Sequence, residues 1–487
     1  MVHSGPMSKR SLLFLIFILL ASAFGSASAQ DQPQPDGPVY IVQEGDNLWD
    51  IALRFGVSVD AILAANALGA DQPINVGVRL VIPGFENLGI TGVLNTVTVG
   101  YGEDLNSLSR RTGVTIEVLA RLNRLVSANE IYAGMPLVLV ENEAALNDPD
   151  SSSLAPGARP LLRPGQSLLE LAVLRGENPW KLANANGVAS NSALLPGQVL
   201  WLPQPGAASG PGGFPDAVSA VTVEPLPVGQ GRTLQLVLSG EPGMDLGGSL
   251  AGYSFDFFNS SDSNYDALQG VHAMLEPGFY PLVITGTLST GESFGFSQAV
   301  YVKEGDYVYD PTLIVSPETI DPAVTKPEDA QWAALTAPVT PEKFWNGQFQ
   351  APVPPEFADC FPSRFGSRRS YNNGSYDYFH TGLDFCGNNT TDVLAPAGGR
   401  VVFAGPLTVR GNATIIDHGQ GVYTGYLHQS KLLVEAGEMV QPGQVIGKIG
   451  ATGRVTGPHL HWEIWINGVQ VDPLEWLEKA FPGEGNS

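Results

Sequence analysis

A threefold internal repeat in the N-terminal part of this 487-residue chain most constrains what it can fold into. Three glycines, Gly45, Gly102 and Gly165, can be aligned without a gap, and many other positions then match. The matching positions are Leu48, Leu105 and Leu168; Gly56, Gly113 and Gly176; Asn66, Asn123 and Asn186; Gly77, Gly134 and Gly197; and Leu80, Leu137 and Leu200. Such regular self-similarity indicates three copies of one supersecondary unit rather than one large domain.

Each copy has the pattern strand, helix, helix, strand. In the first copy, residues 40–43 and 79–82 are expected to be extended, and Gly56 is expected to end the first helix. The i, i+3, i+4, i+7 spacing of an amphipathic helix is followed by Leu48, Ile51, Ala52 and Phe55. Caps for the second helix are provided in the three copies by Ser58, Thr115 and Asn178. The sequence therefore predicts three small α+β (βααβ) modules.

These copies resemble LysM modules, which bind glycans containing N-acetylglucosamine, such as peptidoglycan or chitin. The resemblance places modules at residues 39–84, 95–141 and 157–203. The third copy is the most divergent, with Arg175 where the first has Phe55. Whether the third module binds glycan is left open.

The N-terminus has the features of an export signal. Lys9 and Arg10 precede an apolar run over residues 12–20, and Ala27-Ser28-Ala29 offers a cleavage site. This pattern predicts a secretory signal peptide over residues 1–29, and no later stretch is apolar enough to span a membrane. The net charge of −23 disfavours nucleic acid as a partner. We expect a periplasmic or extracellular protein associated with the cell wall, of unknown oligomeric state.

Two further regions separate the repeats from the C-terminal part. A Gly/Pro/Ala-rich linker, residues 205–215, predicts few contacts across that boundary. Period-2 apolar runs in residues 216–304 favour an all-β, Ig-like sandwich. Residues 305–350 form a Pro-rich connecting segment with a short helix expected over Glu328–Leu335. Its aromatic residues are expected to pack on the next domain: Trp332, Phe344, Trp345 and Phe349.

The C-terminal region, residues 351–480, reads as nearly all β and contains five of the seven histidines. His459 and His461 lie in an alternating run, so on a strand they share one face. Imidazole and carboxylate groups are typical Zn²⁺ ligands, and His380 with Asp384 could supply the other side of a metal site.

This region is similar to the LytM/lysostaphin-type zinc metallopeptidases of peptidase family M23. The matching runs are Ser363-Arg-Phe-Gly-Ser-Arg368, His380-xxx-Asp384, Ala395-Pro-Ala-Gly-Gly399, Asp417-His418-Gly419, Tyr426-Leu-His428, Gly443-Gln-Val-Ile-Gly447 and Thr456-Gly-Pro-His-Leu-His461. The resemblance implies an antiparallel β-domain with zinc on the floor of a groove. It implies that zinc is bound by His380, Asp384 and His461, and that the catalytic pair is His428 and His459.

Three protein ligands are typical of a catalytic rather than a structural zinc site. No HExxH helix supplies a glutamate base, so the imidazoles of His428 and His459 are the candidates for proton transfer. Glu463 lies on the His461 face by strand parity and is a candidate to orient that ligand. His418 is interpreted as structural.

The two cysteines, Cys360 and Cys386, both lie in this region. In an exported protein a disulfide is the leading interpretation. Two free thiols are an alternative, and Cys386 as a zinc ligand is another, because it lies two residues from Asp384.

Together these features predict a secreted, zinc-dependent endopeptidase that hydrolyses peptide cross-links of peptidoglycan and is tethered to the glycan by LysM modules. The alternative is a non-hydrolytic peptidoglycan-binding activator or scaffold for another cell-wall hydrolase. The sequence does not specify which peptide bond is cut, the thickness of the wall, the role of the sandwich, or whether residues 305–350 inhibit the groove.

Overall fold

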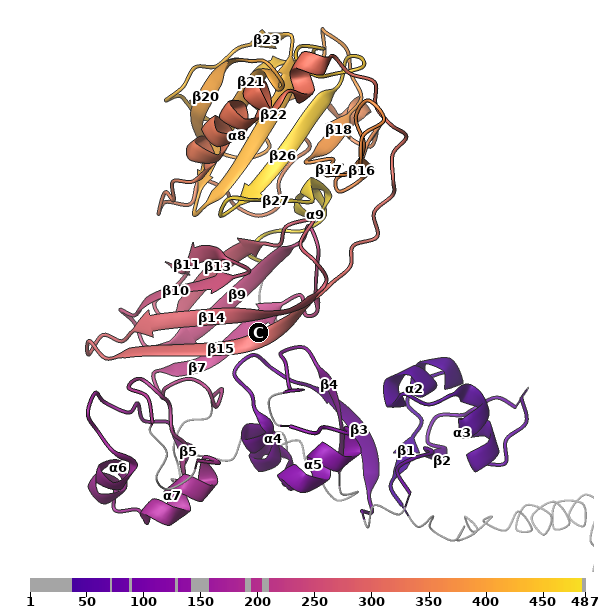
Figure 1. Ribbon diagram of the computed structural model, residues 1–487, viewed down its shortest axis with the longest axis vertical. Helices are drawn as coiled ribbons and strands as arrows, with labels where there is room; N and C mark the ends of the chain where they lie inside the picture. The colour runs from indigo at the N-terminus through magenta and orange to yellow at the C-terminus, as the bar shows by residue number, and fades with distance from the viewer. Residues whose placement is uncertain are drawn as a thin grey trace, which may run out of the picture. The chain divides into compact units, whose positions relative to one another are not determined.

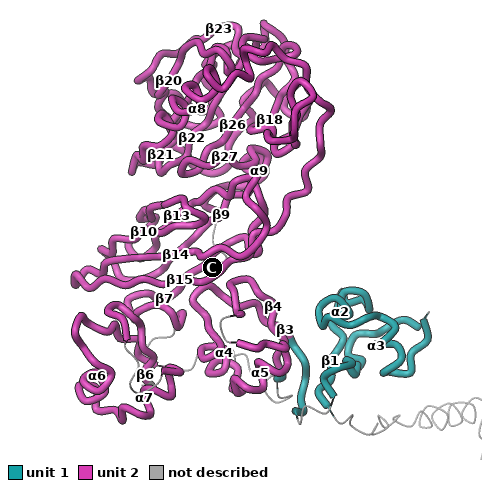
Figure 2. Tube along the Cα trace, in the orientation of Figure 1, with its two compact units in different colours: residues 1–95, 140–144 teal, residues 96–139, 145–487 magenta. Residues whose placement is uncertain are grey.

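The computed structural model describes residues 37–70, 72–86, 90–127, 130–141, 157–188, 194–203 and 210–483. The predicted signal peptide lies outside these residues, as do residues 205–209 of the predicted linker. The chain forms two compact units, residues 1–95 with 140–144, and residues 96–139 with 145–487 (Figure 2). Within the described part of the chain, no helix has both the length and the apolar character needed to cross a membrane.

The three repeat copies have the predicted order of elements. The first consists of β1 (Val39–Ile41), α2 (Leu48–Phe55), α3 (Val59–Ala65) and β2 (Arg79–Val81). The second consists of β3 (Val93–Thr98), α4 (Leu105–Thr112), α5 (Ile116–Leu122) and β4 (Pro136–Glu141). The third consists of β5 (Gly157–Ala158), α6 (Leu168–Arg175), α7 (Pro179–Ala185) and β6 (Leu202–Pro203). Gly56 ends α2 in the left-handed conformation, and the predicted caps of the second helices are formed by Ser58, Thr115 and Asn178.

The repeated asparagine has a clear structural reason. The Asn66 side chain accepts from the backbone N–H of Val81 at 2.7 Å and donates to the Val81 carbonyl oxygen at 2.8 Å. The same pair of bonds joins Asn123 to Val138 and Asn186 to Trp201, with the same sequence separation of 15. Each asparagine thus fastens the second helix of its module to the closing strand.

Residues 218–303 form two packed sheets with a shared apolar core. The five-stranded sheet has the order β11-β10-β14-β15-β8, and the four-stranded sheet has the order β12-β13-β9-β7. The strands are β7 (Val218–Glu224), β8 (Val228–Gly229), β9 (Thr233–Gly240), β10 (Asp245–Leu250), β11 (Tyr253–Asp256), β12 (Phe258–Asn259), β13 (Asn264–Gly270), β14 (Gly278–Thr287) and β15 (Ser293–Lys303).

The expectation of few contacts between the repeats and this two-sheet region is wrong for the second and third copies. The buried Tyr101 hydroxyl donates to the Leu282 carbonyl oxygen at 2.8 Å, and the Gly102 N–H donates to Gln298 Oε1 at 2.8 Å. The Ala133 N–H donates to the Ala299 carbonyl oxygen at 2.9 Å. The second module is therefore joined to the sheets by buried hydrogen bonds. The third is joined by Arg159, whose guanidinium donates to the Val218 carbonyl oxygen at 3.1 Å.

The connecting segment contains η2 (Pro317–Ile320) and α8 (Pro322–Thr336). The helix is longer than the predicted Glu328–Leu335. It continues through Pro327, although proline usually ends or kinks a helix. As expected, Trp332, Trp345 and Phe349 are buried on the C-terminal domain. Figure 1 shows α8 lying across the sheet face of that domain.

The C-terminal domain is built on an antiparallel sheet of order β18-β26-β22-β21-β20-β24, with β27 paired to β26. A smaller sheet has the order β19-β25-β23, and β16 pairs with β17. The elements are η3 (Pro355–Phe357), β16 (Arg368–Arg369), β17 (Tyr378–Phe379), β18 (Leu383–Phe385), β19 (Asp392–Leu394), β20 (Gly399–Leu407), β21 (Gly411–Gly419), β22 (Val422–Gln429), β23 (Lys431–Leu432), β24 (Met439–Val440), β25 (Val445–Lys448), β26 (Leu460–Ile466), β27 (Val469–Val471) and α9 (Pro473–Glu478).

The two faces of the large sheet have different partners. One face, with Tyr426 and Trp462, contributes to the main core, and the other, with Tyr423 and Leu427, lies under Trp332 of α8. The predicted disulfide between Cys360 and Cys386 is present, with 5.5 Å between the Cα atoms. The alternatives of free thiols and of a Cys386 zinc ligand are therefore wrong.

Candidate metal centre and active-site groove

Two neighbouring strands place the centre of the site. In the antiparallel pairing of β18 with β26, Asp384 lies directly opposite His461, so their side chains share one face of the sheet. His380 lies in the turn just before β18. Three atoms converge, with His380 Nε2 to Asp384 Oδ1 at 3.0 Å, His380 Nε2 to His461 Nδ1 at 2.9 Å, and His461 Nδ1 to Asp384 Oδ1 at 2.9 Å.

The Ser-x-Phe-Gly motif holds this triangle through its backbone. The Ser363 carbonyl oxygen accepts from the Asp384 N–H at 3.0 Å, and the Ser367 carbonyl oxygen accepts from the His380 N–H at 2.8 Å. Gly382 is required by close approach, because a Cβ there would lie 2.3 Å from the Trp462 carbonyl oxygen. The motif and the glycine thus serve to bring the His380 turn against β26.

The outer nitrogens of the two histidines decide which atoms carry protons. His380 Nδ1 lies 2.8 Å from the Arg364 carbonyl oxygen, which can only accept, so this nitrogen donates. His461 Nε2 lies 3.2 Å from a Glu463 carboxylate oxygen and donates there. In neutral rings the inner atoms, His380 Nε2 and His461 Nδ1, then carry lone pairs, and with Asp384 Oδ1 they form a triangle of ligand atoms. Burial would lower the pKa of His461, but its hydrogen bonds to Asp384 and Glu463 raise it above the ordinary value.

Such a cluster fits a cation. Around a tetrahedral Zn²⁺, with bonds of about 2.0–2.1 Å, ligand atoms lie about 3.3 Å apart, close to the distances found. Burial lowers the pKa of His380 to about 4, which keeps the imidazole neutral at neutral pH, as a metal ligand must be. Burial alone would raise the pKa of Asp384, but His380 and His461 hold it well below its usual range. The donor set and its spacing thus suit zinc.

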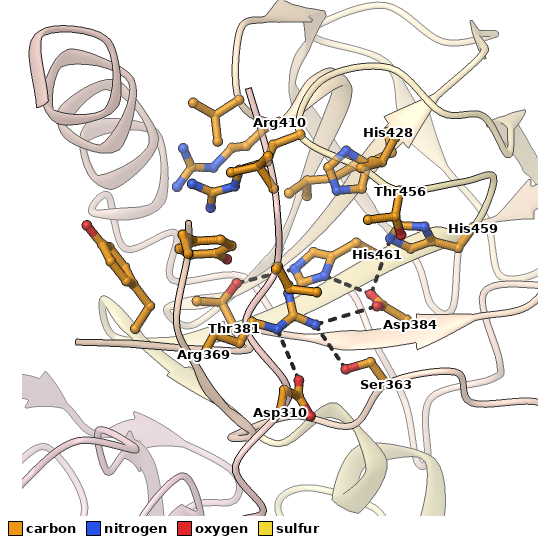
Figure 3. A pocket seen from close by; sticks show the side chains of 18 of the residues that line it. Asp310, Ser363, Arg369, Thr381, Asp384, Arg410, His428, Thr456, His459 and His461 are labelled. Atoms are coloured by element: carbon orange, nitrogen blue, oxygen red, sulfur yellow. Dashed lines mark hydrogen bonds and ion pairs between the residues drawn. The ribbon is translucent and has the colours of Figure 1, made fainter. Parts of the chain in front are cut away.

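Two more imidazoles lie beside this triangle, as the sequence predicts for His428 and His459. The His428 ring centroid is 5.1 Å from that of His459 and 6.0 Å from that of His461. His459 Nε2 is 3.6 Å from Asp384 Oδ1. Figure 3 shows these side chains pointing toward one another in one hollow.

Both imidazoles have the same tautomer for the same reason. His428 Nδ1 lies 2.8 Å from the Thr452 carbonyl oxygen, and His459 Nδ1 lies 2.9 Å from the Gly457 carbonyl oxygen. Each Nδ1 therefore carries the proton and each Nε2 is basic. Burial, with the nearby His461 and His459, lowers the pKa of His428 to about 3, so this group is neutral at physiological pH.

The site opens into a groove of about 750 Å³. One wall comes from the connecting segment, including Asp310 and Leu313, and another from the loop with Thr456. Arg369 lies in the groove, donating to Ser363 Oγ at 2.9 Å, with its guanidinium 3.9 Å from Asp384 Oδ2 (Figure 3). Arg369 was not predicted as a site residue, although it directly follows the Ser363–Arg368 motif.

Glu463 lies behind His461 as strand parity suggests. It is buried, and its Oε1 accepts from His461 and from the Thr381 hydroxyl at 2.7 Å. Burial would raise the pKa of Glu463, but its bond to His461 and neighbouring charges lower it to about 2, so it is ionised. His418 stands apart from the groove, with Nδ1 on the Gly398 carbonyl oxygen and Nε2 on Thr424, consistent with a structural role.

Two models of known protein families match parts of this chain. The model of peptidase family M23 matches residues 378–473, and the LysM domain model matches residues 40–83, 97–140 and 162–203. The chain carries an M23 peptidase domain and three LysM domains. The M23 match includes all five candidate site residues: His380, Asp384, His428, His459 and His461.

Curated relatives with named activities match about a fifth of the chain. The chain is 46% identical over 95 residues to the DD-carboxypeptidase/endopeptidase Mpg of Neisseria meningitidis serogroup B, covering 20% of this chain and 22% of that protein. It is 44% identical over 96 residues to the peptidoglycan DD-endopeptidase ShyA of Vibrio cholerae, with the same coverage of 20% and 22%. The chain thus spans about a fifth of the length of these relatives.

Solved structures are also similar. One titled as an M23 peptidase from Pseudomonas aeruginosa has 28% identity and a TM-score of 0.40, and the alignment covers 52% of this chain and 94% of that one.

Proposed function

We propose that this chain is an exported, zinc-dependent endopeptidase that hydrolyses peptide cross-links of bacterial peptidoglycan. The observation that carries the proposal is the triangle of closely spaced ligand atoms beside two further imidazoles. The peptidoglycan DD-endopeptidase relatives support the substrate class, and the LysM domains support attachment to the glycan.

The metal ligands in this proposal are His380, Asp384 and His461. Zinc bound there would lower the pKa of a bound water to about 7 and polarise the scissile carbonyl. The two histidines are prepared for this role because their outer nitrogens are already hydrogen-bonded, which fixes the orientation of each ring.

The acid–base residues in this proposal are His428 and His459. Both present an unprotonated Nε2, so either can accept the proton of the attacking water and, once protonated, donate it to the leaving amine. Their Nδ1–H groups are held by backbone carbonyls, so the rings need not reorient during the reaction.

The remaining domains have supporting roles in the proposal. The two-sheet region, residues 216–304, is assigned as an Ig-like sandwich, and residues 305–350 connect it to a peptidase domain at 351–480. Residues 1–29 are assigned as the signal peptide, which would deliver the protein to the periplasm or the cell exterior.

The test uses the mature chain, purified peptidoglycan and mass spectrometry of the released muropeptides. The zinc-loaded protein should convert cross-linked muropeptides to monomers, a chelator should stop the conversion, and added zinc should restore it. His461→Ala should be inactive under all three conditions. If the wild-type protein binds the wall and stimulates another hydrolase without cutting any cross-link, the proposal is wrong and the non-hydrolytic alternative holds.

A further inference from the structure

Helix α8 lies outside the region matched by the M23 family model, yet it reaches the metal centre. Its residue Trp332 is 1% exposed and packs on the sheet face that also carries His461. Trp332 belongs to a buried apolar cluster with Ala413, Ile415, Tyr423 and Leu427. The indole N–H of Trp332 donates to Glu463 Oε2 at 3.2 Å.

The Glu463 carboxylate is completely surrounded by donors. Trp332 and Trp465 donate to Oε2, the latter at 2.9 Å. Oε1 accepts from Thr381 Oγ1 at 2.7 Å, from Gln470 Nε2 at 3.1 Å and from His461 Nε2 at 3.2 Å. Because Glu463 is 1% exposed, a lost protein donor could not be replaced easily by solvent.

We propose that Trp332 is a positioning residue of the metal centre, acting through Glu463 on His461. By holding Oε2, Trp332 fixes the carboxylate plane so that Oε1 faces His461 Nε2. That contact fixes the tautomer that leaves Nδ1 free as a ligand. The inference rests on the proposed function, in which His461 binds zinc.

A second contact fixes where the helix sits. Glu328, one turn before Trp332, accepts from the backbone N–H groups of Val409 and Arg410, both at 2.9 Å. Its Oε1 also accepts from the Arg410 guanidinium at 3.1 Å. The Arg410 carbonyl oxygen accepts in turn from the backbone N–H of His428 at 3.0 Å. Glu328 therefore holds α8 against the loop beside the site, and this contact fixes the position of Trp332.

Three single substitutions in the full mature chain test the inference. Trp332→Phe and Trp465→Phe each remove one N–H donor to Glu463 and keep an aromatic ring. Trp345→Phe is the matched control, because Trp345 lies in the same connecting segment, is 5% exposed and donates instead to the Phe481 carbonyl oxygen at 2.8 Å.

The readout is the zinc dissociation constant of the metal-free protein, measured by competition with a chromophoric chelator. Trp332→Phe and Trp465→Phe should each weaken zinc binding by about 10-fold, within the range for groups that orient a ligand. Trp345→Phe should leave it unchanged within about twofold, even if its thermal stability falls as much. In a Glu463→Gln background, Trp332→Phe should have little further effect, because its route to His461 is already broken.

Equal zinc affinity in Trp332→Phe and wild type overturns the inference, and so does an equal loss in Trp345→Phe. These results are distinguishable from failure of the proposed function. If His461→Ala binds zinc as tightly as wild type, the ligand assignment itself is wrong. If His461→Ala loses zinc while Trp332→Phe does not, only the role of Trp332 is refuted.

Discussion

Glu475 in α9 makes the stability of the protein depend on pH at the contact between the sandwich and the peptidase domain. Its side chain is 4% exposed and accepts from the Thr233 N–H of β9 at 2.7 Å. Arg232 and Lys479 each approach its Oε2 only to 3.8 Å. Burial raises the pKa of Glu475 from 4.5 to about 7, more than these contacts lower it.

The sign and size follow from that shift. Between pH 4.5 and 7 the folded state holds a proton on Glu475 that the unfolded state has lost, so the free energy of unfolding falls as pH rises. The shift corresponds to about 3 kcal/mol, present in full below pH 4.5 and lost above pH 7. Glu475→Gln keeps an oxygen to accept from Thr233 but cannot ionise. It should therefore exceed wild type in stability by up to about 3 kcal/mol at pH 8, and match it near pH 4.5.

Urea unfolding followed by tryptophan fluorescence is a suitable assay, because Trp476 is buried next to Glu475 in the same helix. The exposed Glu478→Gln on that helix is the control, since it removes a carboxylate without touching the contact. The reasoning fails if the stability difference between Glu475→Gln and wild type is the same at pH 5 and pH 8.

Three further outcomes are expected. His461→Ala should lose both zinc and activity, whereas His459→Ala and His428→Ala should keep zinc near stoichiometric and lower the rate by about 10² to 10⁴. Elemental analysis measures the zinc content, and a turnover assay measures the rate. Zinc loss in His459→Ala but not in His461→Ala would invert the ligand assignment. Replacing both Cys360 and Cys386 by Ser should lower the free energy of unfolding, measured in denaturant melts, by about 3 kcal/mol, since the disulfide joins residues 26 apart. An unchanged free energy of unfolding would show that the disulfide contributes nothing to stability. Tyr101→Phe should lower the free energy of unfolding by about 1 kcal/mol, because the hydrogen bond to the Leu282 carbonyl oxygen is lost. Retention of this variant on insoluble peptidoglycan should not change. Reduced retention at full stability would place Tyr101 in glycan binding instead.

Local sequence patterns predicted those structural features that depend only on residues close together in the sequence. The caps of the repeat helices depend on side chains within three residues of the bonds they make, so Ser58 and Thr115 could be assigned from the sequence. The shared face of His459 and His461 follows from the two-residue period of a strand. The ligand triangle needed the family resemblance in addition, because no local rule places β18 beside β26.

Contacts between domains could not be predicted from these local sequence patterns. Tyr101 occupies a position where the other two copies have Glu44 and Pro164, and this aromatic residue is a sequence signal that could have indicated its contact with Leu282. Trp332 was expected to be buried, but its hydrogen bond to Glu463 joins residues 131 apart in the sequence. A buried aromatic residue is predictable from its apolar character, whereas the partner of its N–H depends on the tertiary fold.

His428 shows most clearly why the position of a candidate catalytic side chain could not follow from strand parity. Its neighbour Leu427 pairs with His461 in the sheet, so Leu427 and His461 share the face under α8. Strict alternation would turn His428 to the opposite face, into the core beside Tyr426. Instead His428 has a φ of +65°, the left-handed conformation that a residue with a side chain rarely adopts. This conformation ends the alternation at that residue, and the His428 ring lies 6.0 Å from that of His461. The surrounding bonds from the His428 N–H to Arg410 and from Nδ1 to Thr452 hold the strained backbone in place. Strain that persists at a site lined with basic groups is expected when the side chain has a function there, which supports the role proposed for His428.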